Sequence, residues 1–431
     1  MILRVNIEPT DTLSPTRSAL REVPFMGVIW VVAEAMKLGF RNGDPDWCNL
    51  GQGQPEVGEL EGAPPRLTTI ELEPQDHAYG PVGGSEELCS VVAAHQNRLF
   101  REGASSLYTA ANVSVASGGR LALSRLFAAL GSTRLGYQVP DYTAYEDMIA
   151  AQRHRIEPIA FVTDEEHGFA LDPDAFERAV CDEKLGAFVL SNPCNPTGHT
   201  IRGDELAAWV RIARERDCLL ILDEFYSHFQ YDGDAPAAGP VSGASHVVDV
   251  ERDPIVLVDG LTKSFRYPGW RVGWVMGPSE LVDTLGRAAS AIDGGPSMPV
   301  QRAAMQILEP ARADQETDAL RRAFSKKRNL LVERLSALGI RIAPDPTGTF
   351  YAFGNIEALP APLNDVEVFF RRALERKVLT VPGRFFDVNP GKERGGPSPL
   401  ANWVRFSFGP PMDNLRLGLD RLEELVEDAR G

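Results

Sequence analysis

The stretch Ile255-Val-Leu-Val-Asp-Gly-Leu-Thr-Lys-Ser-Phe-Arg-Tyr-Pro-Gly-Trp-Arg-Val-Gly-Trp274 is the one around which the rest of the chain is organised. Four apolar residues, Ile255 to Val258, predict a buried strand that breaks at Asp259-Gly260 and resumes at Arg271. Lys263 therefore follows a core strand, where α/β proteins usually form a pocket. Burial there lowers the pKa of an amine and makes it a nucleophile toward a carbonyl group. The plainer alternative is a solvated loop lysine, and the motifs upstream decide between the two.

Length and composition limit the classes of protein that this chain can be. Its 431 residues predict two domains, or one large domain with a lobe. The formal net charge of −16 argues against nucleic acid or an anionic membrane as the main partner. The longest apolar segment, 25–36, contains Glu34 and is too short to span a bilayer, so no membrane association is expected.

Cysteine usage and the N-terminus predict a cytoplasmic protein. The five cysteines are scattered, odd in number and contain no Cys-x-x-Cys, which indicates reduced thiols and neither a disulfide framework nor a metal site. The first residues lack the basic, apolar and small-residue pattern of a signal peptide, and residues 1–24 are expected to form a surface arm.

Apolar strands alternate with amphipathic helices over the middle of the chain, which predicts a mostly parallel sheet covered on both faces. Strands are expected at 112–116, 136–139, 185–190 and 218–222, and helices at 26–38, 85–100, 120–130, from 140 onward, and at 204–216. Beyond about residue 310 the pattern changes to a smaller α+β lobe. Its expected helices are 314–338, 366–375 and from 413 onward, and its expected strands lie near 340, 348–353, 378–383 and 403–408.

Several of the predicted strands end in polar groups, and the carboxyl ends of parallel strands meet at one edge of a sheet. Ser117-Gly-Gly-Arg120 precedes a helix, so its free N–H groups could hold an anion such as phosphate, although glycines before a helix are more often simple turns. In Asn192-Pro-Cys-Asn-Pro-Thr-Gly198, two Asn-Pro pairs fix an extended backbone that holds the Asn195 amide. Asp223 ends an apolar strand and needs a cationic or N–H partner there; the alternative is a structural salt bridge. Tyr226, three residues later, is either a ligand-facing or a core tyrosine.

Together these motifs resemble the class I/II aminotransferases, which are fold-type I pyridoxal-phosphate enzymes. The matches are Asn192–Gly198, the pair Asp223 and Tyr226, and Lys263 followed by Pro268-Gly-x-Arg-x-Gly273, and the resemblance extends from about residue 23 to the last helix. It implies a large α/β domain with a mostly parallel seven-stranded sheet sandwiched by helices, and a smaller α+β domain from the N- and C-terminal segments. The expected boundaries are 1–60 for the arm and part of the small domain, 61–309 for the cofactor-binding domain, and 310–431 for the C-terminal small domain.

The resemblance also implies pyridoxal 5'-phosphate as the cofactor and assigns roles around its ring. Lys263 is the Schiff-base lysine and proton carrier, and Asp223 pairs with the pyridine nitrogen, which makes the ring an electron sink. Asn195 and Tyr226 hydrogen-bond the ring oxygen, and Tyr142, in Pro140-Asp-Tyr142, stacks on the ring.

The same resemblance implies a phosphate cup and a second subunit. The cup is made by Gly118, Gly119, Arg120, Thr262 and Arg271. Tyr79, in Tyr79-Gly-Pro, is expected to reach the phosphate of the neighbouring subunit, which implies a homodimer.

On the substrate side, the resemblance assigns Gly53, Asn195 and Arg405. Arg405, in Trp403-Val-Arg405, matches the arginine that grips the substrate α-carboxylate, a bidentate task suited to a guanidinium group. Its alternative is a surface salt bridge. Substrate side-chain selectivity is expected in segments 22–30, 77–79 and 294–298.

The expected activity is transfer of an amino group between an L-amino acid and a 2-oxo acid. Gly260 departs from the family pattern, which often has a serine at this position. That departure keeps two alternatives open on the same fold: a lyase of the aminocyclopropane-carboxylate synthase type and an amino-acid oxidase. A cofactor-bound regulator is a further alternative, which the acidic charge and the missing DNA-binding domain disfavour.

Three other features have no role in the family pattern. The insertion Gly391-Lys-Glu-Arg-Gly-Gly-Pro-Ser-Pro399 is expected to be a mobile loop near the mouth of the site. His228 and Cys194 are expected to be bystanders, with His228 a distant candidate for substrate contact.

Overall fold

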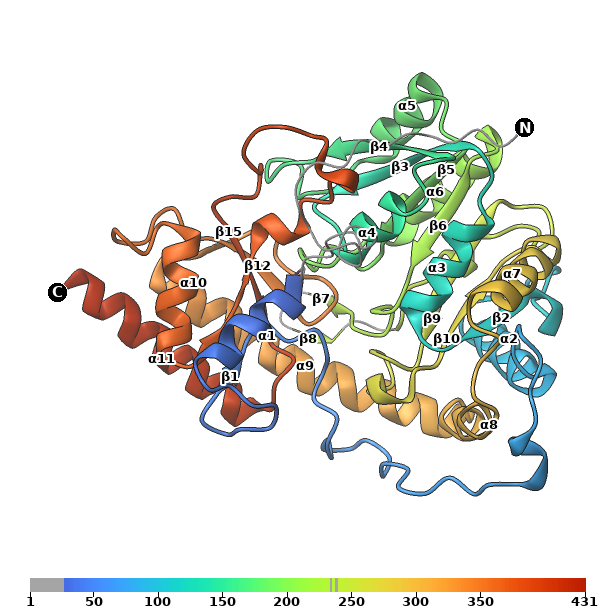
Figure 1. Ribbon diagram of the computed structural model, residues 1–431, viewed down its shortest axis with the longest axis horizontal. Helices are drawn as coiled ribbons and strands as arrows, with labels where there is room; N and C mark the ends of the chain where they lie inside the picture. Colours follow the sequence, from blue (N-terminus) through green and yellow to red (C-terminus); the bar gives the residue numbers. More distant parts are fainter. Residues whose placement is uncertain (1–26, 233–234, 237–238) are drawn as a thin grey trace, which may run out of the picture.

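The computed structural model describes residues 27–232, 235–236 and 239–431. A seven-stranded sheet with strand order β2-β10-β9-β6-β5-β3-β4 forms its centre, and β10 is antiparallel to both of its neighbours while the other pairs are parallel (Figure 1). This confirms the mostly parallel seven-stranded sheet. The strands of this sheet are β2 (Val113–Ala116), β3 (Thr133–Val139), β4 (Ile156–Val162), β5 (Ala187–Ser191), β6 (Leu219–Asp223), β9 (Ile255–Gly260) and β10 (Gly273–Met276).

Helices cover both faces of the sheet because its central strands are apolar on both sides. In β6, Ile221 belongs to the cluster that contains Leu126 of α3, while its neighbours Leu220 and Leu222 belong to the cluster that contains Trp209 of α6. Successive side chains of a strand point to opposite faces, so one apolar run serves two helical layers. The helices of this part are α2 (Glu86–Phe100), α3 (Gly119–Ala129), α4 (Ala144–Ala150), α5 (Pro173–Glu183), α6 (Gly203–Arg216), α7 (Ser279–Ile292) and α8 (Met298–Ile307).

A second, antiparallel sheet of order β11-β12-β15-β14 is built from the C-terminal part of the chain. The N-terminal segment joins it, because β1 pairs in parallel with β13 and α1 lies beside the C-terminal elements (Figure 1). The strands are β1 (Cys48–Asn49), β11 (Arg341–Ile342), β12 (Tyr351–Asn355), β13 (Val378–Leu379), β14 (Val381–Pro382) and β15 (Trp403–Ser407), and β7 (Tyr231–Asp232) with β8 (Ala235–Pro236) forms a separate pair. The helices are α1 (Gly27–Lys37), α9 (Pro310–Leu338), α10 (Val366–Glu375) and α11 (Met412–Arg430).

Most predicted elements lie within a few residues of the observed ones. Ser85 caps α2 as expected, because its hydroxyl accepts from the Leu88 N–H at 3.2 Å. The prediction that the strand breaks at Asp259-Gly260 is wrong, since β9 continues to Gly260, where it pairs with Gly273. Two observed elements, β4 and α5, were not predicted from the sequence. Pro158 sits inside β4, which is tolerated because β4 is an edge strand.

Among the described residues, no helix has the combination of length and apolar character that crossing a bilayer requires. The expected arm at 1–24 lies outside the described residues.

Candidate active site

A cavity of about 1380 Å³ lies where the loops after β5, β6 and β9 meet the second sheet. Eleven of the predicted site residues line it, although they come from segments spread over most of the chain. These are Gly53, Gly119, Arg120, Tyr142, Asn195, Asp223, Tyr226, Thr262, Lys263, Arg271 and Arg405.

Lys263 is a half-buried loop residue whose amine points into this cavity and donates to the carbonyl oxygen of Gly53. Burial lowers the pKa of the amine to about 7, and the positive charges of Arg405, Arg120 and Arg271 act in the same direction. Asp223 opposes this shift. At neutral pH a large share of the Lys263 amine is therefore unprotonated and nucleophilic, which removes the alternative of a solvated loop lysine.

Asp223 is buried at the carboxyl end of β6, as the sequence predicts. Its carboxylate accepts from the Tyr145 hydroxyl at 3.0 Å, and no ion pair is found for it among the described residues. Burial raises the pKa of Asp223 to about 6, while the bond from Tyr145 and the charge of Lys263 lower it. A carboxylate that is ionised near neutrality and open to the cavity suits a protonated ring nitrogen better than a structural salt bridge.

The segment before α3 forms a cradle for an anion. Gly118 is the N-cap of α3 with φ of 94°, and a Cβ there would overlap the Arg271 guanidinium group. The N-terminus of this eleven-residue helix and Arg271 thus face the same space. The Thr262 hydroxyl is buried there without a hydrogen-bond partner among the described residues. A phosphate group would supply the acceptor that this hydroxyl lacks.

Asn195 and Arg405 lie in contact. The Arg405 guanidinium donates to Asn195 Oδ1 and to the Gly51 carbonyl oxygen, each at 2.9 Å. Arg405 is 2% exposed, and within the described part of the chain no carboxylate pairs with it, so it is not a surface salt bridge. Its buried Nε has no partner there either. The arrangement leaves a buried guanidinium group with capacity for an anionic ligand.

Tyr142 follows β3 and lines the cavity beside Arg120, whose Nε donates to the Tyr142 hydroxyl at 3.0 Å. The backbone N–H of Tyr142 is held by the Asp141 carboxylate at 2.6 Å. Asp141 also accepts from Ser191, whose hydroxyl in turn accepts from the Asn195 N–H at 3.1 Å. The buried Asp141 carboxyl therefore ties the Tyr142 loop to the Asn195 loop.

Several residues at the site are absent from the sequence prediction. Tyr351 lines the cavity and contacts both Tyr226 and Arg405. Tyr145 holds Asp223, and Asp141 with Ser191 forms the tie just described. The one sequence signal for Tyr145 is its position three residues after Tyr142, because this spacing places both side chains near the start of the same helix.

Gly260 departs from the family pattern because there is no room for a side chain. A Cβ at this position would lie 2.5 Å from the Val272 carbonyl oxygen and 2.9 Å from Cε1 of Phe225. The Phe225 ring also fills the space beside Gly119, where a Cβ would overlap it. The departure is thus a packing feature of β9 against β10 and Phe225.

Other predicted residues lie away from the cavity. Tyr79 is fully exposed and contributes nothing to the cavity lining. The candidate role of His228 in substrate contact is wrong for this arrangement: its Nδ1 lies 2.7 Å from the Thr317 hydroxyl, and its ring stacks on His95 outside the cavity. Cys194 is buried outside the lining, as expected of a bystander.

Of the three selectivity segments, only 22–30 contributes described lining residues, Val28 and Ile29, and its first five residues lie outside the described chain. The insertion 391–399 contributes none of the lining residues, and its expected position near the mouth stays a prediction. It packs against α4, where Lys392 pairs with Glu146 at 2.6 Å, and Glu393 pairs with Arg153 in the turn that follows α4.

The cavity fits pyridoxal 5'-phosphate, the cofactor implied by the resemblance. It offers a nucleophilic amine in Lys263, a buried carboxylate in Asp223, and an anion cradle with the Thr262 hydroxyl, which has no partner among the residues that the structure describes. It also offers the Asn195 amide, whose Oδ1 is occupied by Arg405, so that Nδ2 remains to donate.

Comparisons with known proteins agree with this geometry. A family model described as aminotransferase class I and II matches residues 45–422. The chain is 28% identical over 401 residues to the aspartate/prephenate aminotransferase of Thermus thermophilus, covering 92% of this chain and 95% of that protein. It is 30% identical over 415 residues to a probable N-succinyldiaminopimelate aminotransferase of Mycobacterium tuberculosis, covering 92% and 96%.

Among solved structures, the chain is similar to the Thermus thermophilus aspartate aminotransferase with maleate. The TM-score is 0.75 at 26% identity, over 96% of this chain and all of the other. The family match covers far more than half of the chain, and both relatives are covered almost completely. The chain therefore belongs to the aminotransferase class I and II family and is a pyridoxal-phosphate-dependent aminotransferase.

Proposed function

We propose that this enzyme moves the amino group of an L-amino acid to a 2-oxo acid with Lys263 as the residue that holds the cofactor covalently and carries the proton. The observation that carries the proposal is the buried Lys263 amine, with its pKa lowered to about 7, in one cavity with Asp223 and Arg405. Few other lysine environments supply a neutral amine at physiological pH.

Asp223, Tyr145 and Lys263 have different roles toward the cofactor in this proposal. When bound, the cofactor supplies an aldehyde and a protonated ring that accepts the electron pair left by the departing α-proton. Asp223 keeps the ring nitrogen protonated by charge, and Tyr145 holds the Asp223 carboxylate in place. The Lys263 amine is the group that would hold the cofactor covalently, and with an amino acid bound it would take the α-proton as a general base.

Substrate orientation falls to Arg405. Its guanidinium group is buried, fixed by Asn195 and Gly51, and has no carboxylate partner in the described chain. An α-carboxylate bound there brings the α-carbon toward Lys263. Tyr142 would cover the ring, Asn195 and Tyr226 would donate to the ring oxygen, and the cup of Gly118, Gly119, Arg120, Thr262 and Arg271 would take the phosphate.

We also propose a cytoplasmic homodimer in which Tyr79 reaches the neighbouring site. Support comes from the complete exposure of this tyrosine, a large side chain that does not line the cavity of its own subunit. The proposed division into residues 1–60, 61–309 and 310–431 follows the pairing of β1 with β13, which brings the N-terminal segment to the C-terminal sheet.

The half-reaction with amino acid alone tests the proposal. Purified holoenzyme mixed with a single amino acid is expected to change its cofactor absorbance and to release one 2-oxo acid per subunit. Aspartate is the first candidate, because both Thermus thermophilus proteins reported above are named for it. A screen of all amino acids that yields no such half-reaction contradicts the proposal.

The lyase and oxidase alternatives rested on Gly260. Packing against Val272 and Phe225 accounts for that glycine. Gly260 therefore no longer favours a lyase or an oxidase, and no other described residue does. Turnover with no need for a 2-oxo acid acceptor would reinstate them.

A further inference from the structure

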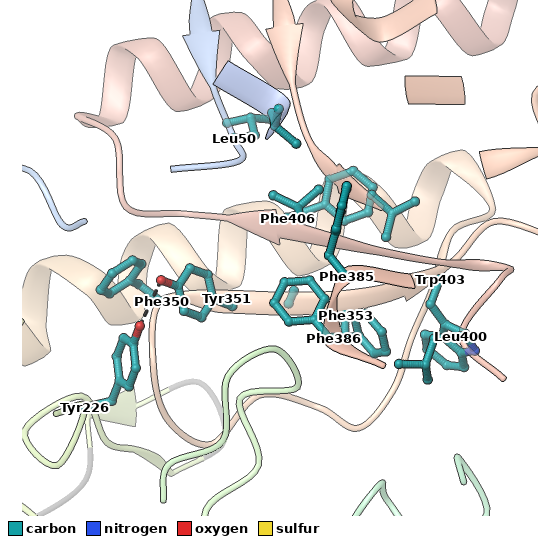
Figure 2. Packing of buried hydrophobic residues seen from close by; sticks show 14 of the residues in the cluster. Leu50, Tyr226, Phe350, Tyr351, Phe353, Phe385, Phe386, Leu400, Trp403 and Phe406 are labelled. Carbon is teal, nitrogen blue, oxygen red and sulfur yellow. Dashed lines mark hydrogen bonds between the residues drawn. The ribbon is translucent and has the colours of Figure 1, made fainter. Parts of the chain in front are cut away.

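The hydroxyl of Tyr351 meets the hydroxyl of Tyr226 inside the cavity. Their oxygens are 3.0 Å apart, and the two residues are 125 positions apart in the chain. Figure 2 shows Tyr226, on the loop after β6, and Tyr351, at the start of β12, turned toward one another. Both side chains are buried, so each hydroxyl needs a hydrogen-bond partner. The two hydroxyls serve as partners for one another.

The start of β12 is held rigidly against the Asn192–Gly198 loop. The Gly348 N–H donates to the Gly198 carbonyl oxygen at 2.7 Å, and a Cβ on Gly348 would lie 2.6 Å from Pro193. The Tyr351 N–H is bonded to the Thr349 hydroxyl at 3.0 Å. Tyr351 is therefore fixed relative to the same loop that presents Asn195.

The ring of Tyr351 has a second contact. The Arg405 guanidinium carbon lies 4.0 Å from the ring centroid, a cation–π distance, and both groups are buried. The ring thus forms one wall of the pocket that holds the carboxylate-binding arginine, while the hydroxyl reaches Tyr226.

The charge of Arg405 also affects the hydroxyl. Burial raises the pKa of Tyr351, and Arg405 lowers it. Two hydroxyls in contact share one hydrogen bond, so only one of them can donate to the other. If Tyr226 turns its proton toward a third oxygen, its own oxygen is left to accept from Tyr351. A donor that is itself hydrogen-bonded in this way becomes a stronger donor.

We propose that Tyr351 is a positioning residue with two separable tasks: its hydroxyl donates to Tyr226 and strengthens the bond from Tyr226 to the cofactor ring oxygen, and its ring holds Arg405 for the substrate carboxylate. The proposal rests on the proposed function, in which Tyr226 faces that ring oxygen. It connects the substrate-binding arginine to the cofactor-binding tyrosine through a single side chain.

Two variants of the holoenzyme separate the tasks. Tyr351→Phe keeps the ring and removes the hydroxyl. A donor to the ring oxygen stabilises its deprotonated form, so weakening that donor raises the pH midpoint of the cofactor absorbance titration, by about half a unit here. The KM for amino acid is expected to change little. Tyr351→Leu also removes the ring, and KM is expected to rise about tenfold.

The control is Tyr231→Phe. Tyr231 is equally buried and its hydroxyl donates at 2.7 Å to the Thr349 carbonyl oxygen, but it does not line the cavity. This variant is expected to titrate like the unaltered enzyme.

Tyr226→Phe and the double variant complete the test. The single change is expected to raise the midpoint further than Tyr351→Phe does, and Tyr351→Phe is expected to add nothing once Tyr226 is phenylalanine. A midpoint unmoved by Tyr351→Phe but raised by Tyr226→Phe overturns the inference and leaves the proposed function standing. A protein that binds no cofactor, or whose midpoint Tyr226→Phe leaves unchanged, overturns the proposed roles themselves.

Discussion

Lys263 owes its chemistry to its surroundings rather than to its side chain. Burial and three guanidinium groups lower the pKa of its amine, and the single negative charge of Asp223 is too little to reverse them. A bound phosphate and a bound carboxylate would neutralise Arg271 and Arg405, so the amine is most nucleophilic before the site is filled. Capture of the cofactor is the step that this environment favours most directly.

The pH dependence of cofactor capture tests this environment. Above its pKa of about 7 the amine has a free electron pair, so attachment to cofactor-free protein is expected to accelerate about fivefold between about pH 6 and about pH 7 and to level off above about pH 8. Stopped-flow absorbance gives the rate, and Lys263→Ala is the blank. An exposed lysine, with a pKa near 10.4, would keep accelerating to about pH 10, and that result would contradict a buried amine.

The glycine at position 260 gives a second prediction for a single residue. Gly260→Ser introduces atoms that meet the Val272 carbonyl oxygen and the Phe225 ring, and it is expected to lower the free energy of unfolding by about 1–3 kcal/mol. Gly269→Ser is the matched control, because nothing lies within 4 Å of its Cβ position. Urea denaturation of both variants measures the difference, and equal stabilities would show that β9 can move to admit a side chain.

At the scale of elements, residues 389–394, which include η7 (Pro390–Lys392), attach the C-terminal part of the chain to α4. Glu146 of α4 is buried and receives both the Lys392 amine and the Asn389 N–H, the latter at 2.9 Å. Tyr145, the neighbour of Glu146, holds Asp223. The insertion thus contacts the helix that carries Tyr145 and takes no part in the lining of the cavity.

Removing this attachment is expected to loosen α4. Glu146→Ala leaves the Asn389 N–H without its acceptor, which costs about 1–3 kcal/mol of unfolding free energy. Hydrogen exchange should rise in α4 and in 389–394 together. Glu393→Gln breaks only the exposed pair with Arg153 and should leave both segments protected. Faster exchange confined to 389–394 would mean that α4 is held by its other contacts.

At the scale of the whole molecule, the cavity of a single chain is lined without Tyr79, which lies exposed on the surface. Tyr79 belongs to an exposed segment that also carries Leu72, and Met298 closes over Gly80 next to it. Apolar side chains exposed together on a long, irregular segment favour burial against a second copy. In the proposed homodimer, Tyr79 of the second subunit would complete the site.

Mixing two inactive variants tests the shared site. In a dimer formed from Lys263→Ala and Tyr79→Ala subunits, one of the two sites has both native residues. Random exchange of subunits is therefore expected to restore about a quarter of the native activity. Light scattering before and after exchange checks the dimer mass. Activity no higher than that of the separate variants would place Tyr79 outside the neighbouring site.

The sequence alone determined the fold class and most of the chemistry of this protein. The apolar runs of β5, β6 and β9 are local and doubly buried, and the polar residues that follow them mark the sheet edge where a site forms. The sequence could predict Lys263, Asp223 and Asn195 as site residues because each lies at or just after the end of one of these strands.

Only the tertiary structure decided how these groups are held and which others join them. Tyr145 reaches Asp223 across 78 positions and Tyr351 reaches Tyr226 across 125, and the reason for Gly260 lies in Phe225 and Val272. Periodicity and motif spacing describe neighbours along one element. They carry no information about which side chains of distant elements meet, because that depends on how the two sheets pack around the cavity.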